Sequence, residues 1–144
     1  MEDIAVIPIS GEEDLGAAFA IRKSVFVDEQ NVELRLEFDG LDRDAKHLVA
    51  TLDDKPVGTL RLRQIDNQTG KIERVAVLLE ARGRAVGKAL LKAALSQLKA
   101  DGAKSAKLHA QTHALEFYAG LGFVAFGDVF DEDGLPHRAM LRDL

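Results

Sequence analysis

A glycine-containing basic turn stands directly before the most regular helical pattern in the chain. The turn reads Arg82-Gly83-Arg84-Ala85-Val86-Gly87-Lys88, and apolar residues recur at helical spacing from Ala85 to Ala100. The first N–H groups of a helix lack partners within the helix, and the helix dipole favours negative charge there. Glycines leave room for an anion beside the main chain, and basic side chains add positive charge. The turn therefore predicts a phosphate or diphosphate site, with a solvated helix start as the plain alternative.

The charge distribution agrees with an anion site in this region. The formal net charge of the chain is −5, which argues against a surface built to bind nucleic acid. The segment from Arg82 to Lys107 nevertheless carries seven basic residues and a single acidic residue, Asp101. The positive charge is therefore local.

Two common nucleotide-binding motifs are excluded. The turn has no Gly-Lys-Ser or Gly-Lys-Thr of a P-loop. It also follows strands of antiparallel type late in the chain, whereas the dinucleotide-binding turn opens a parallel unit. The anion site must belong to another class of fold.

Length and composition predict one folded domain covering residues 1–144. The chain has 144 residues, of which 47% are hydrophobic and 30% charged, and it contains no cysteine. No apolar run is long enough to span a membrane and the N-terminus does not resemble a signal peptide, so we expect a cytoplasmic protein without membrane association. The four histidines show no ligand spacing, so we expect no metal.

The pattern of elements predicts an α+β fold in which helices flank a mixed, mostly antiparallel sheet. A first strand is expected at 4–9, followed by a helix that opens with a capping box, Ser10 and Glu13, and ends near Lys23. A second helical or irregular stretch reaches Leu36, and residues 37–45 form an acidic loop. The other expected strands are 46–52, 57–65, 71–78, 105–111, 123–130 and 137–142, with helices at 85–100 and 112–121.

The basic turn resembles the pyrophosphate loop of the GNAT superfamily of N-acyltransferases, Arg/Gln-x-x-Gly-x-Gly/Ala, except that Ala85 stands where glycine is usual. A second stretch is similar to another signature of that family: Gln111-x-x-Ala114-x-x-Phe117-Tyr118-x-x-x-Gly122-Phe123, with Gln111 in place of the usual asparagine. Further segments resemble the ElaA-type branch of the superfamily: Arg22-x-x-Val25-Phe26-Val27-x-Glu29-Gln30, Glu37-x-Asp39-x-x-Asp42-x-x-Ala45-x-His47 and Leu108-His109-Ala110-Gln111.

The resemblance implies an N-acetyltransferase that uses acetyl-coenzyme A as co-substrate and the primary amine of a small molecule or peptide as acceptor. On this interpretation residues 82–88 and Gln111 hold the coenzyme, and the main chain of Val75, Ala76 and Val77 pairs with its pantetheine arm as an added strand would. An N–H group there would polarise the thioester oxygen. The amine attacks the thioester directly, so the absence of cysteine is no obstacle.

The resemblance also assigns roles to side chains. Tyr118, the single tyrosine, is expected to donate a proton to the departing thiolate; the alternative is a half-buried structural tyrosine. Glu73 and His109 are both candidates for the base that deprotonates the amine, and both could equally be strand residues in polar pairs. The acceptor groove is expected to contain Arg22, Phe26, Asp39, Asp42 and His47.

Two other functions stay open. Arg22, Phe26, Asp39, Asp42 and Arg61 are also similar to residues of acyl-homoserine-lactone synthases, which share this fold but use acyl carrier protein. A coenzyme A-binding regulator without catalysis is the second alternative. Exposed strands near the C-terminus make a homodimer possible.

Overall fold

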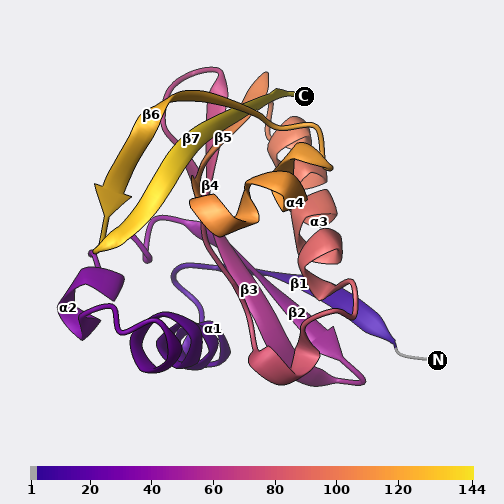
Figure 1. The fold of residues 1–144 in the computed structure, drawn as a ribbon. Helices are drawn as coiled ribbons and strands as arrows, with labels where there is room; N and C mark the ends of the chain where they lie inside the picture. Colours follow the sequence, from indigo (N-terminus) through magenta and orange to yellow (C-terminus); the bar gives the residue numbers. More distant parts are fainter. Residues whose placement is uncertain (1–2) are drawn as a thin grey trace.

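One seven-stranded sheet organises the protein, with helices on both of its faces (Figure 1). The computed structural model describes residues 3–144. The strands lie in the order β1-β2-β3-β4-β5-β7-β6, so the last two exchange places relative to the sequence. The sheet is mixed and mostly antiparallel, which confirms the predicted fold class.

The first four strands form an antiparallel meander. They are β1 (Ile4–Ser10), β2 (Lys46–Leu52), β3 (Lys55–Gln64) and β4 (Thr69–Val77). The turn between β2 and β3 consists of Asp53 and Asp54, both with positive φ, as two-residue hairpin turns require. The sequence placed these strands within two residues of their observed bounds.

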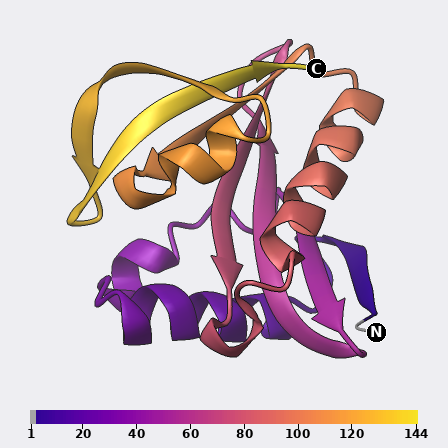
Figure 2. The ribbon, with the colours of Figure 1, turned by 45° about the vertical axis from the view of Figure 1, so that its right-hand side comes forward.

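Helices from distant parts of the chain cover opposite faces of this meander (Figure 2). The long helix α3 (Val86–Ala100) buries Leu90, Leu91 and Ala94 against one face, in the main core. The helix α1 (Gly16–Arg22) packs on the other face, where Ile21 meets Ala76 of β4 in a second cluster. Side chains alternate along a strand, so the meander is buried on both faces.

The helical segment after β1 begins later than expected. Ser10 and Glu13 make the predicted exchange, since the Ser10 N–H donates to the Glu13 carboxylate at 2.9 Å, but the chain only turns there. The Gly11 N–H donates to Ala45 O at 2.9 Å, and a Cβ at Gly11 would lie 2.1 Å from Asp42 O. This contact ties Gly11 to the 42–45 loop, and α1 starts only at Gly16.

Two irregular elements follow α1. The chain continues as a π-helix, η1 (Lys23–Glu29), and then forms the single turn α2 (Leu34–Glu37). π-Helical turns are rare and often occur at functional sites. The predicted helical or irregular stretch to Leu36 corresponds to these two elements.

The sheet divides between β4 and β5 (Ser105–Gln111). These two parallel strands pair only from Thr69↔Ser105 to Ile72↔Leu108 and then diverge, so the sheet opens as a fork. Beyond the fork, β5 pairs with β7 (Leu135–Asp143), and β7 pairs with the edge strand β6 (Val124–Glu132). The short helices η3 (Thr112–Ala114) and α4 (Leu115–Ala119) cover β5 on the α3 side of the sheet.

None of the helices in residues 3–144 has the length and apolar character needed to cross a membrane.

Candidate active site

A cavity of about 1140 Å³ occupies the fork between β4 and β5. It is bounded by η1 and α2 on one side, by the N-terminal end of α3 and by α4 on the other, and by the β6–β7 turn. Its volume exceeds the 300–1,000 Å³ typical of small-molecule sites, so the cavity has room for two reactants. The family signatures and the predicted bases converge here.

The basic turn forms one end of this cavity. Its lining includes Arg82, Gly83, Ala85, Val86, Gly87 and Lys88, while Arg84 belongs to the same turn without lining the cavity. Gly83 has a φ of 77° and open space where a side chain would project. Free helix N–H groups, Lys88 and uncovered main chain meet at this end, which is the arrangement expected for a diphosphate.

Arg82 has protein partners instead of pointing only into the cavity. Its two terminal nitrogens donate to the Glu29 carboxylate at 2.7 Å each, and its Nε donates to Val77 O at 3.0 Å. The pair lowers the pKa of Glu29, because the charge-assisted hydrogen bonds favour the carboxylate. Arg82 thus fastens the basic turn to η1 and β4, and part of its charge is balanced by Glu29.

Ala85 carries the one departure from the family pattern in this turn, and its backbone explains why glycine is usual. It is the N-cap of α3 with φ 65° and ψ 14°, the left-handed conformation. That conformation costs a residue with a Cβ about 1–2 kcal/mol.

We expect Ala85→Gly to raise the free energy of unfolding by about 1 kcal/mol, or the Tm by about 2–4 °C, because it removes this strain. Differential scanning calorimetry of the variant and the wild type measures this difference in Tm. An unchanged or lower Tm in the variant would contradict the interpretation that Ala85 is strained.

A bulge interrupts β4 where the coenzyme arm is expected. Thr59 pairs with Ala76 and Arg61 with Glu73, so Arg74 and Val75 together oppose Leu60. Arg74 takes up the bulge with φ 55°. A bulge leaves the extra residue without a partner on the neighbouring strand. On its other edge β4 has no registered partner in β5 beyond Ile72↔Leu108, so main-chain groups of Val75, Ala76 and Val77, which all line the cavity, are available to a ligand there.

Tyr118 lines the cavity from α4. It is 8% exposed, and within residues 3–144 its hydroxyl has no hydrogen-bond partner. Burial raises the pKa of this phenol, because ionisation is unfavourable away from water. A protonated hydroxyl without another partner can donate a proton to a departing group.

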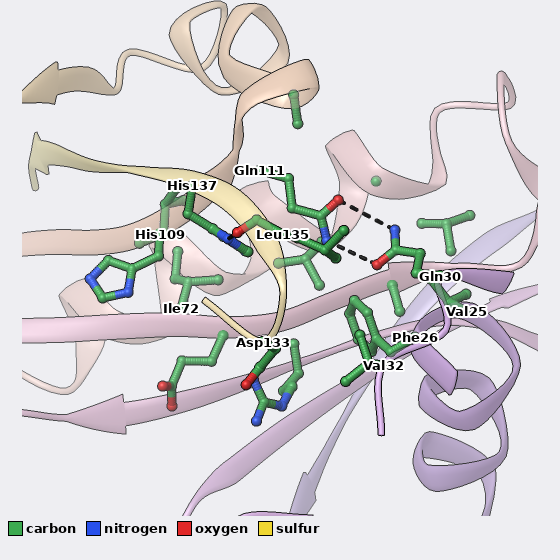
Figure 3. Close-up of a pocket in the computed structure, with 18 of the residues that line it drawn as sticks. Val25, Phe26, Gln30, Val32, Ile72, His109, Gln111, Asp133, Leu135 and His137 are labelled. Carbon is green, nitrogen blue, oxygen red and sulfur yellow. Dashed lines mark hydrogen bonds and ion pairs between the residues drawn. The ribbon is translucent and has the colours of Figure 1, made fainter. Parts of the chain in front are cut away.

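Gln111 lies at the end of β5 and faces Gln30 across the cavity (Figure 3). The two amides exchange hydrogen bonds, Gln111 Nε2 to Gln30 Oε1 at 3.0 Å and Gln30 Nε2 to Gln111 Oε1 at 3.3 Å. The pair joins η1 to the far arm of the fork.

The two candidate bases have different surroundings. Glu73 accepts from Arg61, Arg63 and Lys71, with its carboxylate oxygens 3.0 Å from Arg61 Nη2 and 3.2 Å from Lys71 Nζ. These cations outweigh the effect of burial and lower its pKa to about 2. His109 instead has its Nδ1 2.9 Å from a carboxylate oxygen of Glu132.

The expected acceptor residues divide into two groups. Phe26 and Asp39 line the cavity, so their role as acceptor-groove residues stays a prediction. The prediction was wrong for Arg22, Asp42 and His47, which are buried and do not line it: Arg22 is 1% and His47 0% exposed. Arg22 instead donates to Glu37 at 2.5 Å and to Asp42 at 2.6 Å, and the His47 imidazole contacts Asp42 O at 2.9 Å.

Sequence reasoning assigned no role to several residues of the cavity. Gln30 belongs to a segment that resembles the ElaA-type branch but was given no function, Arg74 was not singled out, and Glu132 and His137 lie at what the sequence shows only as a hairpin turn. The alternation of β6 and β7 could have placed the last two on one face, but not beside His109. No group of three or more histidine or acidic residues in the described part of the chain is arranged to hold a metal ion.

Comparisons with known proteins identify the family. Residues 11–144 match the family model described as an acetyltransferase (GNAT) domain. An uncharacterised N-acetyltransferase of Bacillus subtilis, YjcF, is 41% identical over 134 residues, covering 92% of this chain and 94% of the relative. Protein ElaA of Escherichia coli is 33% identical over 134 residues, covering 90% and 88% respectively.

Solved structures agree in fold. The crystal structure of Escherichia coli ElaA superposes with a TM-score of 0.87 at 32% identity, covering 97% of this chain and 99% of that one. An acyl-CoA N-acyltransferase from Pseudomonas aeruginosa gives a TM-score of 0.85 at 31% identity, with the same coverage. This chain is an acyltransferase that belongs to the GNAT acetyltransferase family, in its ElaA-type branch.

Proposed function

We propose that this protein transfers the acetyl group of acetyl-coenzyme A directly to the primary amine of a small molecule or peptide. The observation that carries the proposal is the forked cavity, which joins the basic turn at the start of α3, an interrupted strand and a tyrosine hydroxyl that has no hydrogen-bond partner among residues 3–144. A structural neighbour from Elizabethkingia anophelis with the same fold has acetyl-CoA bound, at a TM-score of 0.76 and 16% identity.

The residues present fit the coenzyme. Gly83 leaves the main chain open at the basic turn, and Lys88 adds a positive charge beside the N-terminus of α3. The edge of β4 beyond Ile72 offers main-chain groups along the fork, and Gln111 offers an amide on the opposite arm. The basic turn and Lys88 would hold the diphosphate, and β4 and Gln111 would hold the pantetheine arm.

The proposed chemistry is direct transfer. Bound in this way, acetyl-coenzyme A supplies an activated acyl group. The amine nitrogen forms the new bond to carbon while the carbon–sulfur bond breaks, and Tyr118 protonates the thiolate that leaves. A main-chain N–H at the bulge would stabilise the developing negative charge on the carbonyl oxygen.

A direct assay tests the proposal. The purified protein is incubated with acetyl-coenzyme A and a set of amines that includes ethylamine, hydroxylamine and lysine-containing peptides, and thiol release is followed. Release that depends on the amine, with the acetylated amine found by mass spectrometry, supports the proposal. Tight binding without release favours the regulator, and lactone formed with S-adenosylmethionine favours the acyl-homoserine-lactone synthase activity.

The anion end of the cavity gives a separate prediction. We expect Gly87→Glu to weaken binding of coenzyme A at least about 100-fold, about 2.7 kcal/mol, measured by isothermal titration calorimetry. The reason is that the new carboxylate would stand in the first turn of α3, beside the expected diphosphate. Folding should be preserved, because acidic residues are favourable in the first turn of a helix.

Gly87→Gln is the matched control for this prediction, because it adds nearly the same bulk without charge. A Cβ at residue 87 would lie 3.4 Å from Phe117 Cζ, so both variants share the steric effect. The difference between them measures repulsion of an anion. Equal affinities for the two variants would place the diphosphate elsewhere.

A further inference from the structure

The two strands that form the fork place two titratable residues at its apex. Ile72 and Leu108 are the last registered pair of β4 and β5, and both are buried in the main core. The next residues, Glu73 and His109, therefore begin the two arms and share the opposite face of the sheet. Both line the cavity, so either could reach an amine that enters the fork.

Glu73 is poorly suited to take a proton. Arg61, Arg63 and Lys71 surround its carboxylate, and its pKa of about 2 means that the proton would be bound only weakly. An efficient base needs a pKa closer to the working pH. The ion pairs instead make Glu73 the acceptor for three cations of β3 and β4.

His109 has the geometry of an oriented base. A carboxylate can only accept hydrogen bonds, so the contact of 2.9 Å between His109 Nδ1 and Glu132 Oε1 requires the proton to be on Nδ1. In the neutral imidazole, Nε2 then carries the lone pair. The hydrogen bond from His109 lowers the pKa of Glu132, so the carboxylate is charged at neutral pH and stabilises an imidazolium.

Neighbouring groups hold this pair in place. The Phe130 ring packs edge-on against His109, with centroids 5.0 Å apart, and stacks with His137 at 6.1 Å. His137 Nδ1 donates to Leu135 O at 2.8 Å, and its Nε2 lies 3.7 Å from the second oxygen of Glu132. Glu132 is thus fixed between two imidazoles that both line the cavity, and that of His109 stands at the apex of the fork.

We propose that His109 is the general base of the acetyl transfer and that Glu132 is the positioning residue that sets its tautomer and stabilises its charged form. The inference rests on the proposed function. His109 Nε2 takes the first proton from the protonated acceptor amine and so frees its lone pair. The carbon–nitrogen bond then forms as the carbon–sulfur bond breaks, and the second nitrogen proton passes to solvent. Tyr118 gives its proton to the thiolate, and solvent restores both groups after the products leave.

Two amines of different basicity test the role of His109. At pH 7 ethylamine is almost wholly protonated and needs a base, whereas hydroxylamine is largely neutral. With ethylamine we expect His109→Gln to lower kcat/KM about 100-fold or more, because general bases contribute about 10²–10⁴-fold. With hydroxylamine we expect a loss below about 10-fold. Equal losses with both amines, or no loss with either, would overturn the inference while leaving the proposed function intact.

Glu132→Gln tests the positioning role, with Asp131→Asn as control because Asp131 is the exposed neighbouring acid on β6. ¹⁵N NMR of the His109 imidazole should show the Nδ1–H tautomer in the wild type and in Asp131→Asn. Glu132→Gln should show a larger Nε2–H fraction and a loss of about 10-fold with ethylamine. An unchanged tautomer would remove Glu132 from its role. If none of the amines in the set causes the wild type to release thiol, the proposed function fails and the inference fails with it.

Discussion

Tyr118→Phe should lower kcat by about 10²–10⁴-fold while leaving the Kd for acetyl-coenzyme A nearly unchanged. The structure predicts this split because the hydroxyl is the one group removed and because, among residues 3–144, it has no hydrogen-bond partner to lose. Burial keeps the phenol protonated by raising its pKa, so the wild type always has the proton to give.

Three measurements on the same variant separate an acid from a structural tyrosine. Steady-state thiol release gives kcat, calorimetry gives the Kd for the coenzyme, and thermal unfolding gives Tm. The aromatic contacts of Tyr118 with Phe117 and Phe123, at centroid distances of 5.1 and 6.1 Å, are kept by phenylalanine, so Tm should hardly change. An unaltered kcat would exclude Tyr118 as the acid, and a large fall in Tm would show a structural role.

The fold was largely predictable because its regular elements repeat simple patterns. The apolar residues of α3 recur at helical spacing, and the predicted range 85–100 differs by one residue from the observed Val86–Ala100. The strands β2 and β5 were predicted at their observed bounds, since turn residues flank each of them. The division of the sheet was not predictable, because nothing in the local pattern says where two parallel strands stop pairing.

The location of the site was predictable where its residues lie close together in the sequence. The basic turn and the tyrosine segment form contiguous motifs, and both reach the cavity. The contact between His109 and Glu132 joins residues 23 positions apart, on strands that are not neighbours in the sheet. Such a pair follows only from strand order and register, which one sequence does not fix.

The ion pairs of Asp39 and Asp42 were also not predictable from the sequence. Asp39 and Asp42 were expected in the acceptor groove, where they could attract a cationic amine, with a solvated acidic loop as the alternative. Asp42 is instead 8% exposed and accepts from both Arg22 and Arg61, while Asp39 accepts from Arg61 at 2.9 Å. These hydrogen bonds lower the pKa of both aspartates despite their partial burial. The carboxylates hold the loop to β3, which the residue types alone do not reveal.

Arg22→Met should therefore act on stability instead of acceptor binding. Arg22 is 1% exposed, and its guanidinium donates to the Glu37 side chain, to Glu37 O at 2.9 Å and to Asp42. Removing one member of a buried ion pair costs about 3–5 kcal/mol, because the remaining charges stay buried without compensation. We expect a loss near the lower limit, since Arg74 Nε still lies 3.4 Å from Glu37 and Arg61 still donates to Asp42. Chemical denaturation measures the loss.

Lys23→Met is the control one residue along the chain. Lys23 makes an exposed ion pair with Asp28 at 3.3 Å, and surface pairs contribute about 0–1 kcal/mol, so the free energy of unfolding of Lys23→Met should hardly differ from that of the wild type.

At a temperature where Arg22→Met is folded, the KM of Arg22→Met for the amine should stay within about threefold of the wild-type value, because Arg22 does not line the cavity. The reverse pattern, full stability with a strongly raised KM, would return Arg22 to the acceptor groove. Burial favours the first pattern, because a guanidinium that both Glu37 and Asp42 already occupy has little capacity to bind a substrate.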